Sequence, residues 1–213
     1  MVYALLAFLV GALASTMVLA VRERRRCDRL AAELDGVRAE VSMLERRDGC
    51  TGLWNSRHFV EALTREIERS RTYGRPVALA LASVDGLEEE GADTDETMRL
   101  LGSSIGGSVR ALDVACRVGG TEFGVIMAET DSRSASVAAE RVLRAMARVR
   151  SPNGLQPQAA VGIASCPAHA EGFDELVERA GSALRSARRA VRREEQRAGT
   201  VTVSMAVWDE SEE

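Results

Sequence analysis

The chain has 213 residues, of which 46% are hydrophobic and 28% are charged. This length and composition suit one globular domain of ordinary size with an appendage, and they allow a substantial core. The net charge of -4 gives no general indication of nucleic-acid binding. The four cysteines stand far apart, with no CxxC spacing and no histidine cluster, which argues against disulfides and zinc and suits a reducing compartment.

The first segment is an apolar run without charge. It extends from Val2 to Ala20, about the length of helix that crosses the hydrocarbon core of a bilayer. A cleaved signal peptide carries its basic residues before the apolar run, whereas here the arginines follow it, at 22–26. The sequence therefore predicts a single transmembrane helix at 2–21 in the inner (cytoplasmic) membrane. The positive-inside rule then places the rest of the chain in the cytoplasm.

A basic juxtamembrane segment and a short stalk are predicted at 22–47. Apolar residues in this segment recur at alternating spacings of three and four, as in the a/d seam of a coiled coil, and charged residues fill most other positions. We expect a parallel homodimer, although a short amphipathic helix packed on its own domain remains the alternative. The seam residues are Cys27, Leu30, Leu34, Val37, Val41 and Leu44.

From Asp48 onward, helical and strand patterns alternate. Two glycines, Gly119 and Gly120, separate two apolar runs and predict a hairpin whose primed turn uses both at positive φ. The order helix, strand, helix, hairpin, helix, strand, helix, strand indicates an α/β (α+β) fold, a mixed sheet with helices packed on it, of the ferredoxin-like or palm class. The domain is expected at 48–207, followed by an acidic tail at 208–213. The expected helices cover 58–73, 95–112, 134–149 and 173–193, and the strands 77–84, 114–118, 121–129, 158–165 and 200–207.

Four motifs in this region carry a family resemblance. They are DGCTGLWNSRHF at 48–59, RVGGTEFGVIM at 117–127, AVGIASCP at 160–167 and RAGSALRSARRAVR at 179–192. In this order they resemble the GGDEF domain family, the diguanylate cyclases, which join two GTP molecules into cyclic di-GMP. The resemblance covers nearly three quarters of the chain. It implies a nucleotidyl-cyclase palm fold and a role in bacterial cyclic di-GMP signalling.

The resemblance also locates two missing acids. Active members carry a metal-binding acid at the third place of GG(D/E)EF and another at the first aspartate of D-x-D-x-F-K, and these positions hold Thr121 and Ser83 here. Phosphoryl transfer needs carboxylates that hold divalent cations, and a hydroxyl is a poor replacement. We therefore expect no metal, no cofactor and no catalysis. If activity remained, Glu122 would be the catalytic acid, Asp85 on the same strand face would supply the metal-binding carboxylate, and Mg²⁺ would be required.

Other parts of the active-site region are also altered. The connection before the second helix reads EEEGADTDE, which is short and acidic, although Asp95 aligns with the acid that reads the guanine edge. Arg188 and Arg192 match phosphate-contacting positions of the last helix, but an arginine-rich run is also typical of a solvated face. The whole degenerate region comprises Ser83, Asp85, Asp95, Gly119, Gly120, Thr121, Glu122, Phe123, Arg188 and Arg192.

The inhibitory site for cyclic di-GMP is retained in sequence. Arg110 and Asp113 reproduce the family's R-x-x-D element, and Arg141 falls where the family carries the arginine that completes the site. An arginine can donate twice to guanine O6 and N7, while an aspartate accepts from the N1 and N2 edge. The alternative is a surface salt bridge between Arg110 and Asp113, of little energetic consequence.

The sequence leaves three candidate functions, ranked here from the most to the least favoured. The first is a membrane-anchored cyclic di-GMP receptor without catalysis, the second is a nucleotide-free scaffold for an unknown protein partner, and the third is a residual diguanylate cyclase. Nucleic acid is not an expected partner. His58 and His169 are expected at the surface, and Trp54 and Trp208 in packing roles.

Overall fold

The computed structural model describes residues 46–87, 92–154, 156–198 and 203–209, together with Arg22 and Arg24. The chain divides into one unit up to Glu45 and a second compact unit from Arg46 onward. The predicted transmembrane segment and nearly all of the predicted stalk lie outside the described residues and stay predictions. Within the described residues, no helix has the length and hydropathy needed to span a membrane.

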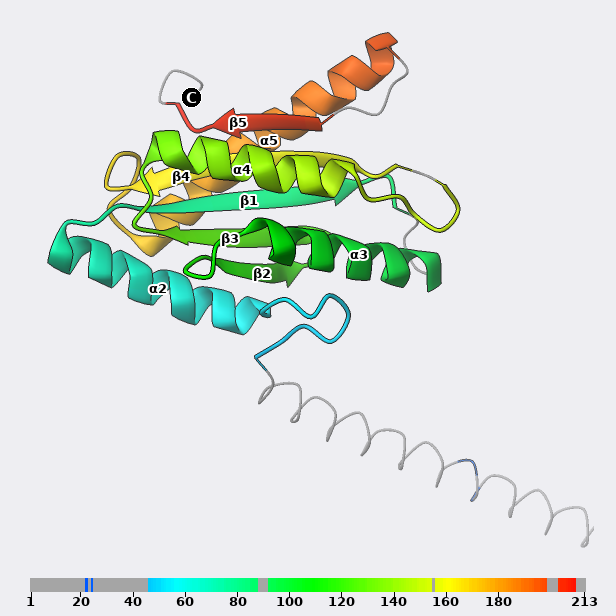
Figure 1. Ribbon diagram of the computed structural model, residues 1–213, viewed down its shortest axis with the longest axis horizontal. Helices are drawn as coiled ribbons and strands as arrows, with labels where there is room; N and C mark the ends of the chain where they lie inside the picture. The colour runs from blue at the N-terminus through cyan, green and yellow to red at the C-terminus, as the bar shows by residue number, and fades with distance from the viewer. Residues whose placement is uncertain are drawn as a thin grey trace, which may run out of the picture. The chain divides into compact units, whose positions relative to one another are not determined.

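The second unit alternates helices and strands in the predicted order (Figure 1). Its strands form one mixed sheet in the order β2-β3-β1-β4-β5, in which β4 and β5 are parallel and the other neighbours are antiparallel. The predicted α/β class with a mixed sheet is therefore confirmed. The helices are α2 (Ser56–Tyr73), α3 (Ala92–Ser108), α4 (Ser132–Ala147) and α5 (Phe173–Ala198), and the strands are β1 (Val77–Asp85), β2 (Val114–Gly119), β3 (Glu122–Ala128), β4 (Gln158–Cys166) and β5 (Val203–Val207).

Helices cover both faces of the sheet. Alternate residues of a strand point to opposite faces, so Ala80 and Ala82 of β1 pack in the core with α3 and α4, whereas Val77 and Leu79 pack with α2 and α5. Figure 1 shows α3 and α4 in front of the sheet and α5 behind it. This double burial explains why β1 reads as a continuous apolar run rather than as an alternating one.

The ends of α2 follow ordinary capping rules. The side chain of Asn55 accepts a hydrogen bond from the His58 N–H, 3.0 Å away, which satisfies one of the free donors of the first turn. Gly74 ends the helix in the left-handed region, with φ 66°, and its N–H donates to the carbonyl of Ser70.

Helix α3, predicted at 95–112, differs from the sequence prediction at both ends. It begins three residues earlier than predicted, at Ala92, and it ends at Ser108 instead of at Leu112. The residues after Ser108 form a turn in which the Asp113 carboxylate accepts a hydrogen bond from the Arg110 N–H. The aspartate therefore competes for backbone donors that a longer helix would have used.

The hairpin between β2 and β3 uses one of its two glycines at positive φ. Gly120 has φ 40°, whereas Gly119 is the last residue of β2 and pairs with Glu122 across the turn. The prediction that both glycines take positive φ is therefore wrong, because an irregularity between Arg117 and Gly119 lengthens the strand and leaves Gly120 and Thr121 as the loop.

Candidate functional site

Ser83 and Thr121 lie side by side at one end of the sheet. Ser83 of β1 pairs with Glu122 of β3, and the Val84 N–H donates to the Thr121 carbonyl over 3.1 Å. Ser83 is 2% exposed, and its Oγ has no hydrogen-bond partner. The fold thus brings these two hydroxyl-bearing residues together where β1 lies beside the hairpin.

This arrangement does not fit a divalent cation. Mg²⁺ binds through carboxylate oxygens, whereas the pair formed by Ser83 and Thr121 supplies neutral groups and leaves the Ser83 hydroxyl unpaired. Glu122 is exposed. Among the described residues, no cluster of three or more His, Cys, Asp and Glu side chains is placed to hold a metal ion.

The Asp85 carboxylate, at the end of β1, contacts two arginines of α5. Its two oxygens accept from Arg188 of α5, at 2.7 Å to Nη2 and 3.1 Å to Nε, and Arg192 Nη2 lies 3.8 Å away. The two side chains of the main pair are each about one-third exposed. The interpretation of Asp85 as a replacement metal ligand stays a prediction, and such a role would require the carboxylate to leave Arg188. Arg188 thus contacts the sheet although it lies in an arginine-rich run.

Arg117 links the hairpin turn to residues 46–59, which lead into α2 and are called the entry segment below, a role that sequence reasoning missed. Its Nε and Nη2 donate to the Gly120 carbonyl at 3.0 and 2.8 Å, and its Nη1 lies 3.3 Å from Asp48 Oδ1. Asp48 also accepts from the N–H and the hydroxyl of Thr51. Burial raises the pKa of Asp48, but the Thr51 hydrogen bonds and the Arg117 charge outweigh it and hold the pKa below its usual value. The signal in the sequence was the presence of both residues in family motifs.

The entry segment also contains an aromatic stack. The rings of Trp54 and His58 lie 4.1 Å apart, and the Arg47 guanidinium lies 3.7 Å from the centre of the Trp54 ring. His58 is buried, so the expectation of a surface residue is wrong. Burial and the nearby charge of Arg46 lower its pKa, and the imidazole is neutral at pH 7. The packing roles expected for Trp54 and for Trp208, which lies under Arg179, are confirmed.

The R-x-x-D residues form a tight turn after α3. The Arg110 carbonyl accepts from the Asp113 N–H at 3.0 Å, and Asp113 Oδ2 accepts from the Arg110 N–H at 2.9 Å. Within the described residues, no ion pair joins the two side chains, so the surface salt bridge considered as an alternative is absent. The Arg110 side chain is exposed and projects from a turn whose backbone is fixed by Asp113.

Arg141 lies next to this turn. Its Nε donates to the carbonyl of Ser108, the last residue of α3 and two positions before Arg110. The structure therefore brings the arginine predicted to complete the inhibitory site to the end of α3. A groove of about 680 Å³ continues from there between α3 and α4, and its lining includes Arg141, Arg144 and Arg148 along one side.

Asp95 lies in another part of α3. It is exposed in the first turn of the helix, where its carbonyl accepts from the thiol of Cys50. Arg110 follows 15 positions later, which corresponds to roughly 22 Å along a helix. Asp95 therefore takes no part in the R-x-x-D turn, and its assignment to the active-site region stays a prediction.

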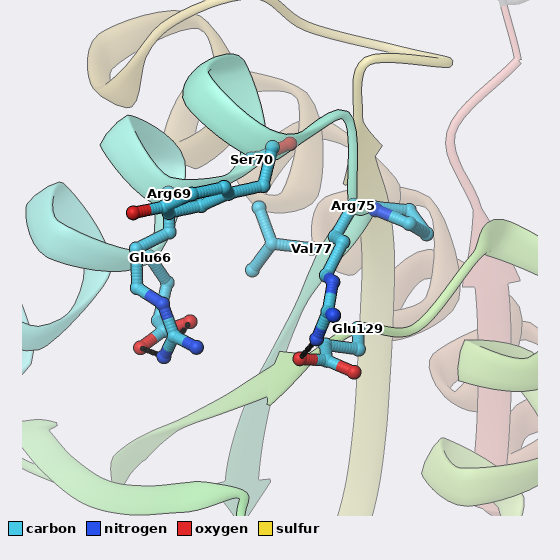
Figure 2. Close-up of a pocket in the computed structure, with 8 residues that line it drawn as sticks. Glu66, Arg69, Ser70, Arg75, Val77 and Glu129 are labelled. Atoms are coloured by element: carbon cyan, nitrogen blue, oxygen red, sulfur yellow. Dashed lines mark hydrogen bonds and ion pairs between the residues drawn. The ribbon is translucent and has the colours of Figure 1, made fainter.

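A separate hollow of about 280 Å³ lies at the start of β1, away from the Ser83 end of that strand (Figure 2). Its charged side chains pair with one another: Arg69 donates to Glu66 at 3.0 Å, and Arg75 forms an ion pair with Glu129. These pairs leave the lining without a free charge for a phosphate ligand. The lining residues are Glu66, Arg69, Ser70, Tyr73, Arg75, Pro76, Val77 and Glu129.

The chain belongs to the family described as "Diguanylate cyclase, GGDEF domain", whose model matches residues 45–194. The assignment agrees with the fold and with the hairpin site described above. It establishes the class of domain and its link to cyclic di-GMP signalling.

One curated relative and two solved structures illustrate the similarity. The probable diguanylate cyclase DgcC of Escherichia coli is 31% identical over 169 residues, which is 76% of this chain and 46% of DgcC. The chain thus spans less than half the length of that relative. The diguanylate cyclase SiaD of Pseudomonas aeruginosa, solved with its activator SiaC, is 26% identical with a TM-score of 0.63, covering 88% of this chain and 79% of SiaD. The GGDEF domain of DgcB from Caulobacter crescentus, solved with cyclic di-GMP, is 20% identical with a TM-score of 0.62, covering 77% and 93%.

Proposed function

We propose that the protein is a catalytically inactive GGDEF signalling protein that binds cyclic di-GMP through Arg110, Asp113 and Arg141. The observation that carries this proposal is the contrast between the two sites. Ser83 and Thr121 replace both metal-binding acids at the hairpin, whereas the R-x-x-D turn is complete and has Arg141 beside it. Such a site needs guanine edges and phosphates but no metal, so its retention does not depend on catalysis. The DgcB domain, solved with cyclic di-GMP, supports this choice of ligand.

Membrane attachment forms a second part of the proposal. The uncharged run at 2–21 would act as a single-pass anchor in the inner membrane, and the arginines at 22–26 would keep the GGDEF domain in the cytoplasm. The seam at 27–44 would pair two copies, and the anchor would favour pairing by raising their local concentration.

Cyclic di-GMP binding is measured by calorimetry on the full-length protein. We expect binding at about micromolar concentration or tighter. Arg110→Ala should weaken it by about tenfold to a hundredfold, because a bidentate contact to guanine is worth about 1–3 kcal/mol. Arg110→Lys should be nearly as weak, since an ammonium group lacks the planar fork. Asp113→Ala should also weaken binding, because it removes both the acceptor for the guanine edge and the carboxylate that holds the backbone turn at Arg110.

The control is Arg71→Ala on α2, which removes one exposed arginine from the other face of the sheet. It should bind like the wild type. Absence of binding by the folded wild type, or equal affinity in wild type and Arg110→Ala, would contradict the receptor proposal. That result would favour a nucleotide-free scaffold, an alternative supported by SiaD, which was solved with a protein activator.

The dimer is tested by sedimentation of the full-length protein in detergent. We expect a dimer, and the double substitution Leu34→Asp with Val41→Asp should shift the protein toward monomer by placing four carboxylates in the paired seam. Substitution of two charged positions outside the seam, Glu33→Gln and Glu40→Gln, provides the control. A monomeric wild type would return this segment to the alternative of a packed helix.

A further inference from the structure

The two edge strands of the sheet differ in how they are covered. The edge of β2 is paired with the entry segment, because the Trp54 N–H donates to the Ala115 carbonyl at 3.1 Å and the Arg117 N–H donates to the Trp54 carbonyl at 2.7 Å. At the other rim of the sheet (Figure 1), no group among the described residues bonds to the outer side of β5. An open edge of this kind is a template for pairing with a further strand.

The outer side of β5 carries the backbone groups of alternate residues. The Trp208 N–H donates to the Ile163 carbonyl of β4 at 2.8 Å, and alternate residues of a parallel strand face the same neighbour. The even-numbered residues of β5 therefore direct their N–H and C=O groups to β4. Val203, Met205 and Val207 direct theirs outward, so these three residues supply the donors and acceptors of the open edge.

The described residues of β5 contain none of the features that protect an edge strand from pairing. Such strands carry charged side chains or proline, or a bulge that twists the edge away. Residues 203–207 read VSMAV, with no charge and no proline, and they pair with β4 without a shift of register. The strand therefore has the features of an edge that a partner covers.

We propose that β5 pairs antiparallel with β5 of a second copy of this chain, in a register centred on Met205. The two Met205 residues then lie opposite each other, and Val203 of one copy lies opposite Val207 of the other. Only these three residues direct their backbone groups outward, so this register satisfies all of those donors and acceptors at once. Each pair also joins two apolar side chains on one face of the extended sheet.

Charges at the two ends of β5 favour a second copy as the partner. Arg192 and Arg193, both exposed, lie near the end of α5, which leads into β5, and Arg192 lies 3.8 Å from Asp85, at the end of the sheet where β5 begins. The exposed Asp209 follows the other end of the strand. Antiparallel pairing brings the end of each β5 to the start of the other, where acid and arginines of different copies attract each other. This interface is separate from the R-x-x-D turn, which precedes β2 at the opposite edge.

The test is disulfide cross-linking of the full-length protein in detergent, in a Cys27→Ser and Cys50→Ser background whose remaining cysteines are buried. Opposite residues that exchange both hydrogen bonds across an antiparallel ladder have Cα atoms about 5.5 Å apart, within reach of a disulfide. Mild oxidation of Met205→Cys should therefore give a disulfide-linked dimer. Ser204→Cys is the matched control, because the two copies of residue 204 lie diagonally at about 7–8 Å. It should give at least about tenfold less dimer, since that separation exceeds the reach of a disulfide.

A second variant covers the case in which Met205→Cys does not fold, as judged by circular dichroism. Val203→Cys with Val207→Cys keeps Met205, and its cysteines should cross-link in the same register. Cys27 restored to the background reports on pairing of the stalk, so failure of that pairing is distinguishable from failure of the β5 pairing. Absence of the dimer from folded Met205→Cys, or from the second variant in its place, would overturn the proposal and leave the edge to a peptide of another protein. Equal cross-linking in Ser204→Cys would overturn it as well.

Discussion

Purified protein incubated with GTP and Mg²⁺ or Mn²⁺ is expected to form no cyclic di-GMP above a blank reaction. Ser83 and Thr121 provide hydroxyls where the reaction needs carboxylates to hold the cations. Loss of one preorganised stabilising group costs roughly 100- to 1000-fold in rate, and two are missing here. Chromatography of the reaction products, beside a GGDEF domain that retains both acids, provides the measurement.

Restoring the acids should not restore the enzyme. In Ser83→Asp with Thr121→Asp, the new carboxylate at position 83 enters a site that is 2% exposed, and Asp85 still holds Arg188. We expect less than about 1% of the activity of the positive control. Turnover by the wild type that Glu122→Ala abolishes would show that the retained acid supports catalysis. Full recovery in the double variant would show that the rest of the site is intact.

The order of helices and strands was predictable because local signals determine it. Gly74 and Pro76 mark the boundary between α2 and β1, and the apolar run that follows is characteristic of a strand buried on both faces. The end of α3 was predicted four residues too late. The actual end of α3 depends on the hydrogen bond between Asp113 and the Arg110 backbone. The spacing of apolar residues gives no sign of such a contact.

The same distinction between local and long-range contacts decides which parts of the candidate sites were predictable. Arg110 and Asp113 are close in sequence, so a short motif was enough to find them. The contact between Arg117 and Asp48 spans 69 positions, and that between Arg188 and Asp85 spans 103. Neither pair shows a local pattern, because packing of α5 and of the entry segment against the sheet brings them together. The same packing buries His58 beside Trp54, whereas the lack of other metal-ligand residues near it in the sequence led to the expectation of a surface residue.

Gly162→Ala is expected to destabilise the domain by about 3 kcal/mol or more. Gly162 lies in β4 where α5 crosses it, and an added Cβ would lie 2.0 Å from the Leu184 nitrogen and 2.4 Å from the Ala180 carbonyl oxygen. Both are backbone atoms of α5, so relief requires the whole helix to move away from the sheet. For a protein of this size the loss corresponds to a fall in melting temperature of roughly 6–12 °C, measured by circular dichroism with a urea titration for the free energy of unfolding.

Gly124→Ala is the matched control because it makes the same substitution in a neighbouring part of the sheet. The added Cβ at position 124 would lie 2.7 Å from Cε2 of Phe59, a side-chain ring that can rotate or shift. We expect a loss of about 1 kcal/mol. Both substitutions remove the same backbone freedom from the unfolded chain, so the difference between them reports the contact with α5. Equal losses in the two variants would show that α5 adjusts to the added methyl group as easily as the Phe59 ring does.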